Sequence, residues 1–258
     1  ARHVLQVAPL KPLEQETDAA DYGALVHAGL HRFLAEHGVR WPADAAARLR
    51  EHLLGALARA GLREALANWW APRLERIADW VADVEIERRS RQFPAAIASE
   101  VPGRWELLRP GGRFTLSGRA DRIERRADGG LAILDYKTGV VPGQSEVDAG
   151  LAPQLPLEAA MAAAGAFGPE CAGAAAELAY WRITGGFTAG QVRPLFKGDP
   201  GAITAGARIA AEALGTLIDA FDGPRCYLSQ PHPGRAPRFS DYAQLARVAE
   251  WSAAGEEP

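Results

Sequence analysis

One segment near the middle of the chain, residues 113–137, constrains the fold more than any other. Residues 131–134, Leu-Ala-Ile-Leu, form an apolar run typical of a strand buried on both faces. A strand-like segment over 113–124 precedes it, and Ala-Asp-Gly-Gly at 127–130 is a strong hairpin-turn signal, because glycine tolerates positive φ. The segment therefore predicts two antiparallel strands inside a sheet, and Gly118 predicts a bulge or a close backbone approach in the first of them.

Charged residues stand where these two strands would meet. Asp121 lies in the first strand, and Asp135 and Lys137 directly follow the apolar run. Alternation places Asp135 and Lys137 on one face of their strand, about 6.6 Å apart at a rise of roughly 3.3 Å per residue. Mg²⁺ prefers oxygen ligands, and a nearby lysine can position a water, so the set suits a metal-dependent phosphodiesterase. The plainer alternative is solvated polar residues at strand ends, but the buried run before them favours a site.

Four motifs resemble those of one nuclease family. Gly-Arg-Ala-Asp-Arg-Ile at 118–123, followed by Ile-Leu-Asp-Tyr-Lys-Thr-Gly at 133–139, resembles the PD-(D/E)xK superfamily and, within it, the RecB-type exonuclease domain. The segment 23–33 resembles that family's Gly-x-x-x-His helix, and 153–160 resembles its Gln-Leu-Pro-Leu-Tyr-Ala helix. The tail at 236–251 resembles that of alphaproteobacterial AddB proteins. The resemblance implies a restriction-endonuclease-like α/β fold, with a mixed central sheet flanked by helices.

The resemblance also implies a role for each matching residue. The implied metal ligands are His27, Asp121, Asp135 and, through its backbone carbonyl, Tyr136. Lys137 would activate or orient the nucleophilic water, and Gln154 would position Lys137 or a phosphate. Glu100 loosely matches a glutamate of the first core strand, and it is included as a candidate catalytic residue. Glu158 departs from the pattern, because the family often has tyrosine at that place.

His27 has a second interpretation. His27 and His31 are four residues apart and would share a helix face. Leu30 and Leu34 lie on the same stripe, so His27 taken alone would be a core histidine. The residue after His27 is alanine, which excludes the His-Glu-x-x-His pattern of zinc proteases. Together with the other motifs, the metal-ligand interpretation is favoured for His27, and His31 is expected to be structural or solvent-facing.

Composition limits the cofactors and the cellular setting. The implied cofactor is Mg²⁺ or Mn²⁺, and no iron–sulfur cluster is expected, because Cys171 and Cys226 are the only two cysteines. So few cysteines form no disulfide framework, and no apolar run suggests a membrane span or a signal peptide. A cytoplasmic location is therefore expected. The chain begins at Ala1 without methionine, which suggests an excised fragment.

The formal net charge of −3 does not by itself indicate nucleic-acid binding. Two arginine groups could contact phosphates or could be solvated surface; they are Arg88, Arg89 and Arg91, and Arg122, Arg125 and Arg126. The expected partners are DNA, in particular single-stranded ends, and an AddA-like helicase–nuclease subunit acting in double-strand break repair. Two alternatives remain: a DNA-binding scaffold of the same fold that no longer cleaves, and a stand-alone RecB-like nuclease.

The pattern of turns and apolar positions predicts the organisation of the chain. An N-terminal arm covers 1–18 and the nuclease domain covers 19–258, with a helical insertion at about 40–92, a catalytic core at about 93–200, and a C-terminal helix and tail over 201–258. Strands are predicted at 96–108, 112–125, 131–137, 177–183 and 191–196. Helices are predicted at 18–36, 42–69, 72–91, 151–164, 201–222 and 242–251. A loop at 140–150 is predicted beside the site.

Overall fold

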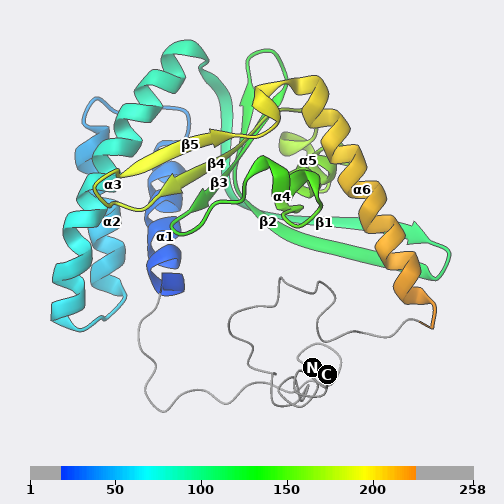
Figure 1. Ribbon diagram of the computed structural model, residues 1–258. Helices are drawn as coiled ribbons and strands as arrows, with labels where there is room; N and C mark the ends of the chain where they lie inside the picture. Colours follow the sequence, from blue (N-terminus) through cyan, green and yellow to red (C-terminus); the bar gives the residue numbers. More distant parts are fainter. Residues whose placement is uncertain (1–18, 225–258) are drawn as a thin grey trace, which may run out of the picture. The chain divides into compact units, whose positions relative to one another are not determined.

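Five strands form one mixed sheet in the order β1–β2–β3–β4–β5 (Figure 1). The strands are β1 (Pro94–Arg109), β2 (Gly112–Arg126), β3 (Leu131–Lys137), β4 (Ala175–Ile183) and β5 (Gly190–Pro194). β3 and β4 run parallel, and the other neighbouring pairs are antiparallel. The structure, a computed structural model, describes residues 19–224. Its mixed sheet with flanking helices is the α/β, restriction-endonuclease-like arrangement that the sequence predicts.

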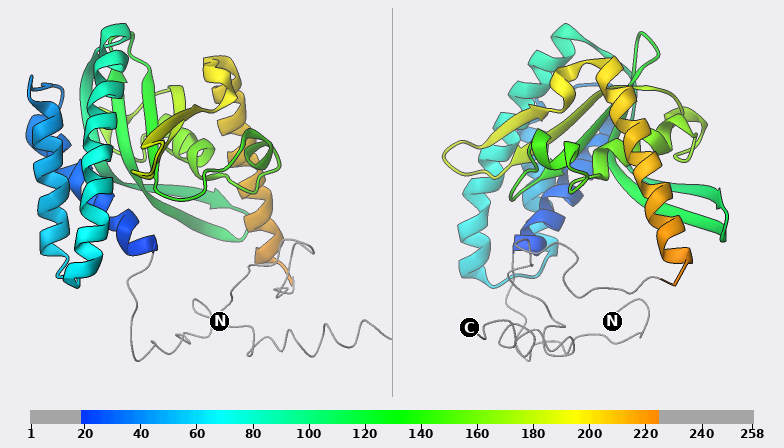
Figure 2. Two further views of the ribbon diagram at one scale, coloured as in Figure 1. Left: turned by 60° about the vertical axis from the view of Figure 1, so that its left-hand side comes forward. Right: turned by 45° about the vertical axis from the view of Figure 1, so that its right-hand side comes forward.

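Helices cover both faces of the sheet (Figure 2). One face carries α1 (Ala19–His37), α2 (Ala45–Arg59) and α3 (Glu64–Arg91), and the other carries α4 (Gln144–Asp148), α5 (Gln154–Ala163) and α6 (Pro200–Asp222). Two short 3₁₀ turns lie at Pro169–Cys171 and Phe196–Gly198. The sheet and its helices belong to one compact unit, Thr17–Asp219. In chain order α2 and α3 come between α1 and β1, as expected for a helical insertion.

β3 is the centre of both cores, as its continuous apolar run predicts. Leu131 and Ile133 pack with α5 and α6, whereas Leu134 and Tyr136 pack with α1 and α3 on the opposite face. Burial on both faces explains why a period of two is missing from this segment of the sequence. The chain leaves the core at Lys137, so the polar residues at this end of β3 lie at the edge of two apolar layers.

The hairpin between β2 and β3 is confirmed. Arg122 pairs with Leu134 and Arg125 with Leu131, and Gly129 takes a positive φ of 86° in the turn. One further step of this register sets Asp121 opposite Asp135. The predicted irregularity at Gly118 is wrong, because Gly118 pairs with Gly103 without a register shift and has open space around it.

The helix boundaries before the sheet differ from the prediction. α2 ends at Arg59 and α3 begins at Glu64, so the predicted break at 70–71 is wrong and Pro72 lies inside a helix. Proline favours a first turn, but the buried stripe of α3 continues across Pro72 from Trp70 to Leu74, and this packing outweighs the lost hydrogen bond.

Three other predictions concern the neighbourhood of the site and the ends of the chain. The predicted loop at 140–150 contains a short helix, α4. The predicted arm at 1–18 and final helix at 242–251 lie outside the described residues. Among the described helices, none has the length and apolar character needed to cross a membrane.

Candidate metal centre and active site

A cavity of about 750 Å³ lies between α1, the middle of β1 and β2, and the end of β3. Its polar lining comes from each of these elements, and includes His27, Glu100, Arg119, Asp121 and Lys137. The β2–β3 hairpin accounts for Asp121 and Lys137, and the packing of α1 on the sheet brings in His27. Residues separated by more than one hundred positions therefore face one cavity.

Asp121 and His27 form the first half of the site. The Tyr136 N–H donates a hydrogen bond of 2.7 Å to Oδ2 of Asp121, which leaves Oδ1 facing Nδ1 of His27 at 3.3 Å. Nε2 of His27 lies 2.9 Å from the carbonyl oxygen of Tyr136. Burial lowers the pKa of His27, but the hydrogen bond and charge of Asp121 outweigh it, so the pKa of His27 is raised.

Glu100 joins this half through an unusual backbone conformation. Its φ is 53°, a strained value for a residue other than glycine. Side chains of a regular strand alternate between faces, yet both Ser99 and Glu100 reach α1: Ser99 bonds Nδ1 of His31 at 2.8 Å, and Oε1 of Glu100 lies 3.7 Å from Nδ1 of His27. The strained residue thus turns a second carboxylate toward His27. His31 has the structural role expected of it.

Asp135, Lys137 and Gln154 form the second half, on the α5 side of β3. The Lys137 ammonium lies 2.8 and 2.7 Å from the two oxygens of Asp135 and 3.1 Å from Oε1 of Gln154. The Gln154 amide also donates to Asp135 at 2.6 Å and to Glu158 at 3.1 Å. The proposed positioning role of Gln154 toward Lys137 is consistent with these contacts.

Two carboxyl groups here have raised pKa values. Burial, and then the neighbouring charge of Asp121, raise the pKa of Asp135 to about 6. Burial raises the pKa of Glu158 to about 8, and the hydrogen bond from Gln154 opposes this only in part. Lys137 lowers the pKa of Asp135 but does not offset the whole cost of burying its charge, and a divalent cation bound nearby would offset more of it.

The donor set fits a hard or borderline divalent cation. Ligand atoms from His27, Glu100 and Asp121 all lie within 4.8 Å of one another. In this group Nδ1 of His27 lies 3.3 Å from Oδ1 of Asp121 and 3.7 Å from Oε1 of Glu100, whereas Nε2 of the same ring contacts the Tyr136 carbonyl. Asp135 is outside this tightest group and has Lys137 as its partner. The structure thus brings every predicted site residue to one place, in two adjoining halves.

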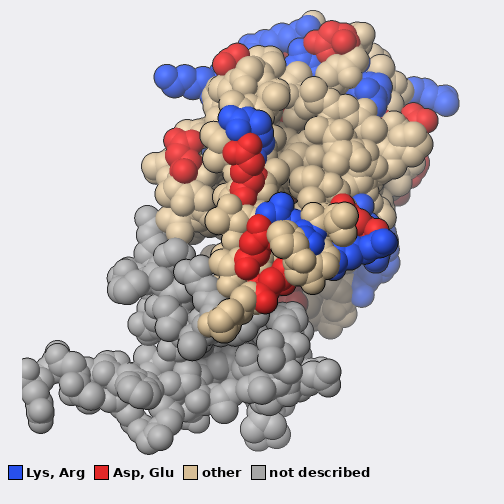
Figure 3. Space-filling view, turned by 90° about the vertical axis from the view of Figure 1, so that its right-hand side faces the viewer, with Lys and Arg blue, Asp and Glu red and all other residues tan. Residues whose placement is uncertain are grey.

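The predicted arginine clusters do not form a phosphate-binding surface. Arg122 is buried and pairs with Glu85 and Glu124, so its interpretation as a phosphate contact or a solvated residue is wrong. Arg88 pairs with Glu124 and Glu177 in the same buried region. On the face that includes α6 and the β1–β2 hairpin, acidic and basic side chains are interspersed rather than segregated (Figure 3).

Arg119 and Glu158 were the contributions to the site that sequence reasoning missed. Arg119 lines the cavity and lies 3.5 Å from Oε2 of Glu100, with a largely exposed side chain that can reach a phosphate. Its place in the Gly-Arg-Ala-Asp motif was the available signal. Glu158 was noted only as a departure from a pattern, whereas it is a buried hydrogen-bond partner of Gln154.

The fold and the site together define a restriction-endonuclease-like nuclease domain. The model of the PD-(D/E)XK nuclease superfamily matches residues 1–246, so the chain belongs to this superfamily, whose members are generally nucleases. An uncharacterized protein of Rickettsia bellii is 27% identical over 161 residues, which are 62% of this chain and 19% of that protein. An uncharacterized protein of Rickettsia typhi is 40% identical over 77 residues, which are 30% of this chain and 9% of that protein.

The chain spans at most about a fifth of the length of these curated relatives. Among solved structures, the crystal structure of SSO0001 aligns over 74% of each chain with 16% identity and a TM-score of 0.28. A likeness this weak does not define a fold.

Proposed function

We propose that this domain is a DNA nuclease that hydrolyses phosphodiester bonds with Mg²⁺ or Mn²⁺. The observation that carries the proposal is the convergence of Asp121, Asp135 and Lys137 at the end of β3, opposite His27 and beside an open cavity. Membership of the nuclease superfamily supports it independently.

In this proposal four groups hold the ion: the imidazole of His27, the carboxylates of Asp121 and Asp135, and the carbonyl of Tyr136. Asp121 is suited to this because the Tyr136 N–H fixes one of its oxygens and leaves the other facing the cavity side. Glu100 is a further oxygen donor beside His27. The ion, when bound, supplies Lewis-acid polarisation of a phosphate oxygen.

Lys137 would orient the water that attacks phosphorus. Its ammonium is held by Asp135 and Gln154 and lines the cavity, so a water in the cavity would lie within its reach. In-line attack forms the bond from water oxygen to phosphorus as the bond to the 3′ oxygen breaks. The 3′ oxygen takes up a proton, and the phosphate stays on the 5′ side. Arg119 would contact a neighbouring phosphate.

The finer proposal is a RecB-type exonuclease domain of an AddAB-type helicase–nuclease that acts on single-stranded ends in double-strand break repair in the cytoplasm. Support comes from the RecB-type motifs and from the AddB-like tail at 236–251. The matched region forms only a fifth of the longer curated relatives, an arrangement that suits a nuclease module of a larger subunit. An AddA-like subunit would then be the partner, and its co-purification with the full-length protein tests this part.

Glu158 favours a second candidate function, a DNA-binding scaffold without cleavage. A buried carboxyl occupies the place where the family often has tyrosine, and it accepts a hydrogen bond from the same Gln154 amide that donates to Asp135. A scaffold would bind DNA and leave it whole, so a cleavage assay separates the two functions.

The decisive experiment is cleavage of end-labelled single-stranded and duplex DNA with Mg²⁺, Mn²⁺ or EDTA. We expect metal-dependent cleavage that falls by about 10²–10³-fold in Asp135→Asn and in Lys137→Ala, the usual effect of removing a transition-state-stabilising group. The matched control is Asp128→Asn at the tip of the same hairpin, which should cleave at the wild-type rate. Equal rates in all three variants, or no cleavage by the wild type, would contradict the proposal.

A further inference from the structure

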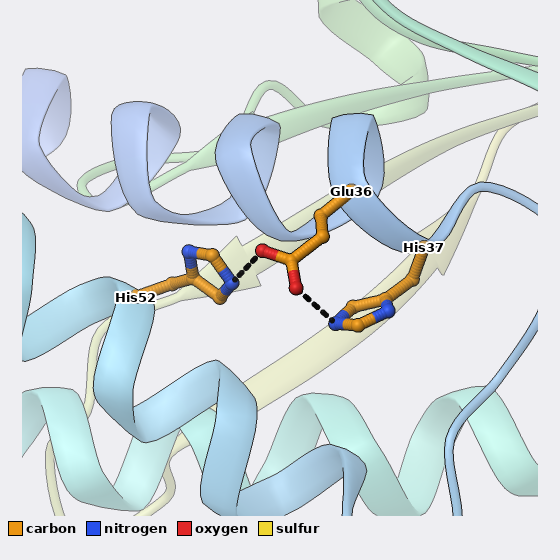
Figure 4. Close-up of side chains that lie close together, drawn as sticks. All are labelled: Glu36, His37 and His52. Atoms are coloured by element: carbon orange, nitrogen blue, oxygen red, sulfur yellow. Dashed lines mark ion pairs between the residues drawn. The ribbon is translucent and has the colours of Figure 1, made fainter.

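A second group of metal-ligand side chains lies in the helical layer, apart from the nuclease site. Glu36 and His37 end α1, and His52 lies on α2 where the two helices pack together (Figure 4). Their ligand atoms all lie within 4.8 Å of one another. None of the three belongs to the motifs that predict the nuclease.

The carboxylate of Glu36 lies between the two imidazole rings (Figure 4). Both rings present the same atom, Nε2, to the carboxylate of Glu36, one to each oxygen (Figure 4). Nε2 of His52 lies 3.2 Å from Oε2, and Nε2 of His37 lies 3.6 Å from Oε1. Ligands about 2.0–2.1 Å from a tetrahedral Zn²⁺ are about 3.3 Å apart, so one oxygen of Glu36 and the two Nε2 atoms would have to close from separations of up to 4.8 Å.

Hydrogen bonding does not account for His37. The 3.6 Å separation exceeds the hydrogen-bond range, and Nε2 of His37 is buried without a hydrogen-bond partner among the described residues. A buried ring nitrogen aimed at a carboxylate it does not bond has an unmet requirement, which a shared cation would satisfy.

Apolar packing fixes the two rings. The ring of Phe33 contacts both imidazoles, with centroid separations of 4.7 Å to His37 and 5.9 Å to His52. Trp41 packs on the other side of Phe33 at 5.1 Å. Nitrogen donors held against aromatic side chains, with a carboxylate on the open side, are characteristic of protein metal sites.

We propose that Glu36, His37 and His52 bind Zn²⁺. Two imidazoles and one carboxylate suit this borderline cation and not Mg²⁺, which prefers oxygen ligands. Three protein ligands leave a fourth position for water or a small anion. A cavity of about 460 Å³ that includes Glu36 and His52 is also lined by three arginines and one further glutamate, Arg32, Arg48, Arg59 and Glu51, and the excess of positive charge favours an anionic fourth ligand.

The bound ion would join the end of α1 to the middle of α2. These helices already pack closely, since a Cβ at Gly29 of α1 would lie 2.6 Å from a methyl group of Leu53. Zinc would therefore stabilise the helical layer on which the position of α1 depends, and it would do so without taking part in cleavage.

Cobalt(II) is the probe, because its visible absorption is intense in four-coordinate sites and weak in six-coordinate ones. The titration uses protein with Asp121→Asn, which removes a ligand of the nuclease site. We expect one equivalent of cobalt with intense bands that zinc displaces. Either His37→Gln or His52→Gln should weaken binding by at least about 10-fold, a loss that even outer-sphere changes produce. Glu36→Gln should do the same, whereas Glu75→Gln, the same change at an exposed residue of α3, should not.

Thermal unfolding provides a second measurement, which shows whether each variant is folded and whether zinc stabilises it. Zinc should raise the midpoint of the Asp121→Asn protein and leave the midpoints of the two histidine variants unchanged. Two separate histidine variants are used so that a folding failure of one leaves the other to decide. The proposal is overturned if the folded Asp121→Asn protein binds no cobalt, if its bands are those of a six-coordinate ion, or if a histidine variant binds as tightly as its parent.

Discussion

Asp121 and Arg122 are neighbours on β2, yet they enter two charged clusters of opposite character. Arg122 points to the α3 side and belongs to a closed cluster, which consists of Glu85, Arg88, Arg89, Arg122, Glu124 and Glu177. Asp121 belongs to an open cluster, which consists of His27, Glu100, Asp121 and Asp135 and adjoins a cavity. The charged groups of the closed cluster stabilise the fold, whereas those of the open cluster are accessible to a ligand in the cavity.

The closed cluster balances its charges internally. Three arginines face three glutamates, and Arg122 lies 2.5 Å from Glu85 and also pairs with Glu124. Its guanidinium is 3.2 Å from the hydroxyl of Tyr136, whose backbone faces the open cluster. Although burial opposes its charge, the two glutamates hold the pKa of Arg122 well above its usual value. Such a cluster has no capacity left for a substrate phosphate.

The open cluster is not balanced from within. Lys137 contacts the carboxylate of Asp135, the largely exposed Arg119 lies 3.5 Å from Glu100, and the third carboxylate, Asp121, faces His27. The cluster also includes the strained backbone of Glu100 and the raised pKa of Asp135. Strain and uncompensated charge cost stability, and both collect at functional sites. Burial and charge alone therefore do not identify a functional site; the balance of charge and access to a cavity do.

The largest effect should come from breaking the closed cluster. Arg122→Met takes away one of the two arginine partners of Glu85 and of Glu124, so that Glu85 keeps only Arg89 and Glu124 keeps only Arg88 among the described residues. Removing one member of a buried ion pair costs about 3–5 kcal/mol. Urea unfolding measures this, with Arg91→Met as control: Arg91 ends α3 and pairs with Glu87 in an exposed bridge, which contributes less than about 1 kcal/mol. Equal stability losses in the two variants would remove the distinction between the clusters.

Most of the sheet could be predicted from the sequence. β3 was predicted with its observed bounds, because an apolar run, a glycine turn and a polar end leave little freedom. The helical layer was less predictable at its boundaries. The preference of proline for the first turn of a helix predicts a helix start at Pro72. In the structure α3 continues through Pro72, because its buried face is continuous on both sides of the proline. Tertiary packing of this kind is not visible in a single sequence.

The sequence predicts which residues belong to the candidate site, but it does not predict their distances, backbone conformations or burial. Motif spacing brought together Asp121, Asp135 and Lys137, since the turn fixes their register. The strained φ of Glu100 and the burial of Arg122 depend on residues more than twenty positions away. The sequence alone leaves a solvated surface as one interpretation of the arginines, whereas four of the six singled out are buried or half-buried and pair with glutamates or with backbone carbonyls.

A smaller change in the free energy of unfolding should come from Mg²⁺, which is expected to bind the open cluster and not the closed one. Mg²⁺ at about 100 times its dissociation constant should stabilise the wild type by about 2.7 kcal/mol, because it binds the folded open cluster and not the unfolded chain. Asp121→Asn removes a proposed ligand and should abolish this gain, whereas Arg91→Met should keep it. Urea unfolding with Mg²⁺ and with EDTA gives the difference directly. A gain that survives in Asp121→Asn would place the cation elsewhere.

The smallest effect concerns Glu158, at the boundary between the open cluster and the α5 core. Its pKa is about 8 in the folded protein and 4.5 as the ordinary value. Between these values the folded state binds more protons than the unfolded state, so stability falls as pH rises through this window. The favourable difference is fully present below about pH 4.5 and is lost by about pH 8.

Glu158→Gln removes this dependence while keeping an amide that can still accept from Gln154. The variant should match the wild type near pH 5 and exceed it in stability at pH 8, measured by urea unfolding in EDTA. Asp135, with its pKa of about 6, titrates in both proteins and cancels in the comparison. Glu75→Gln on the surface of α3 should retain the wild-type dependence. If Glu158→Gln shows the same loss between pH 5 and 8, then Glu158 is ionised in the folded protein, and it belongs with the uncompensated carboxylates rather than with the core.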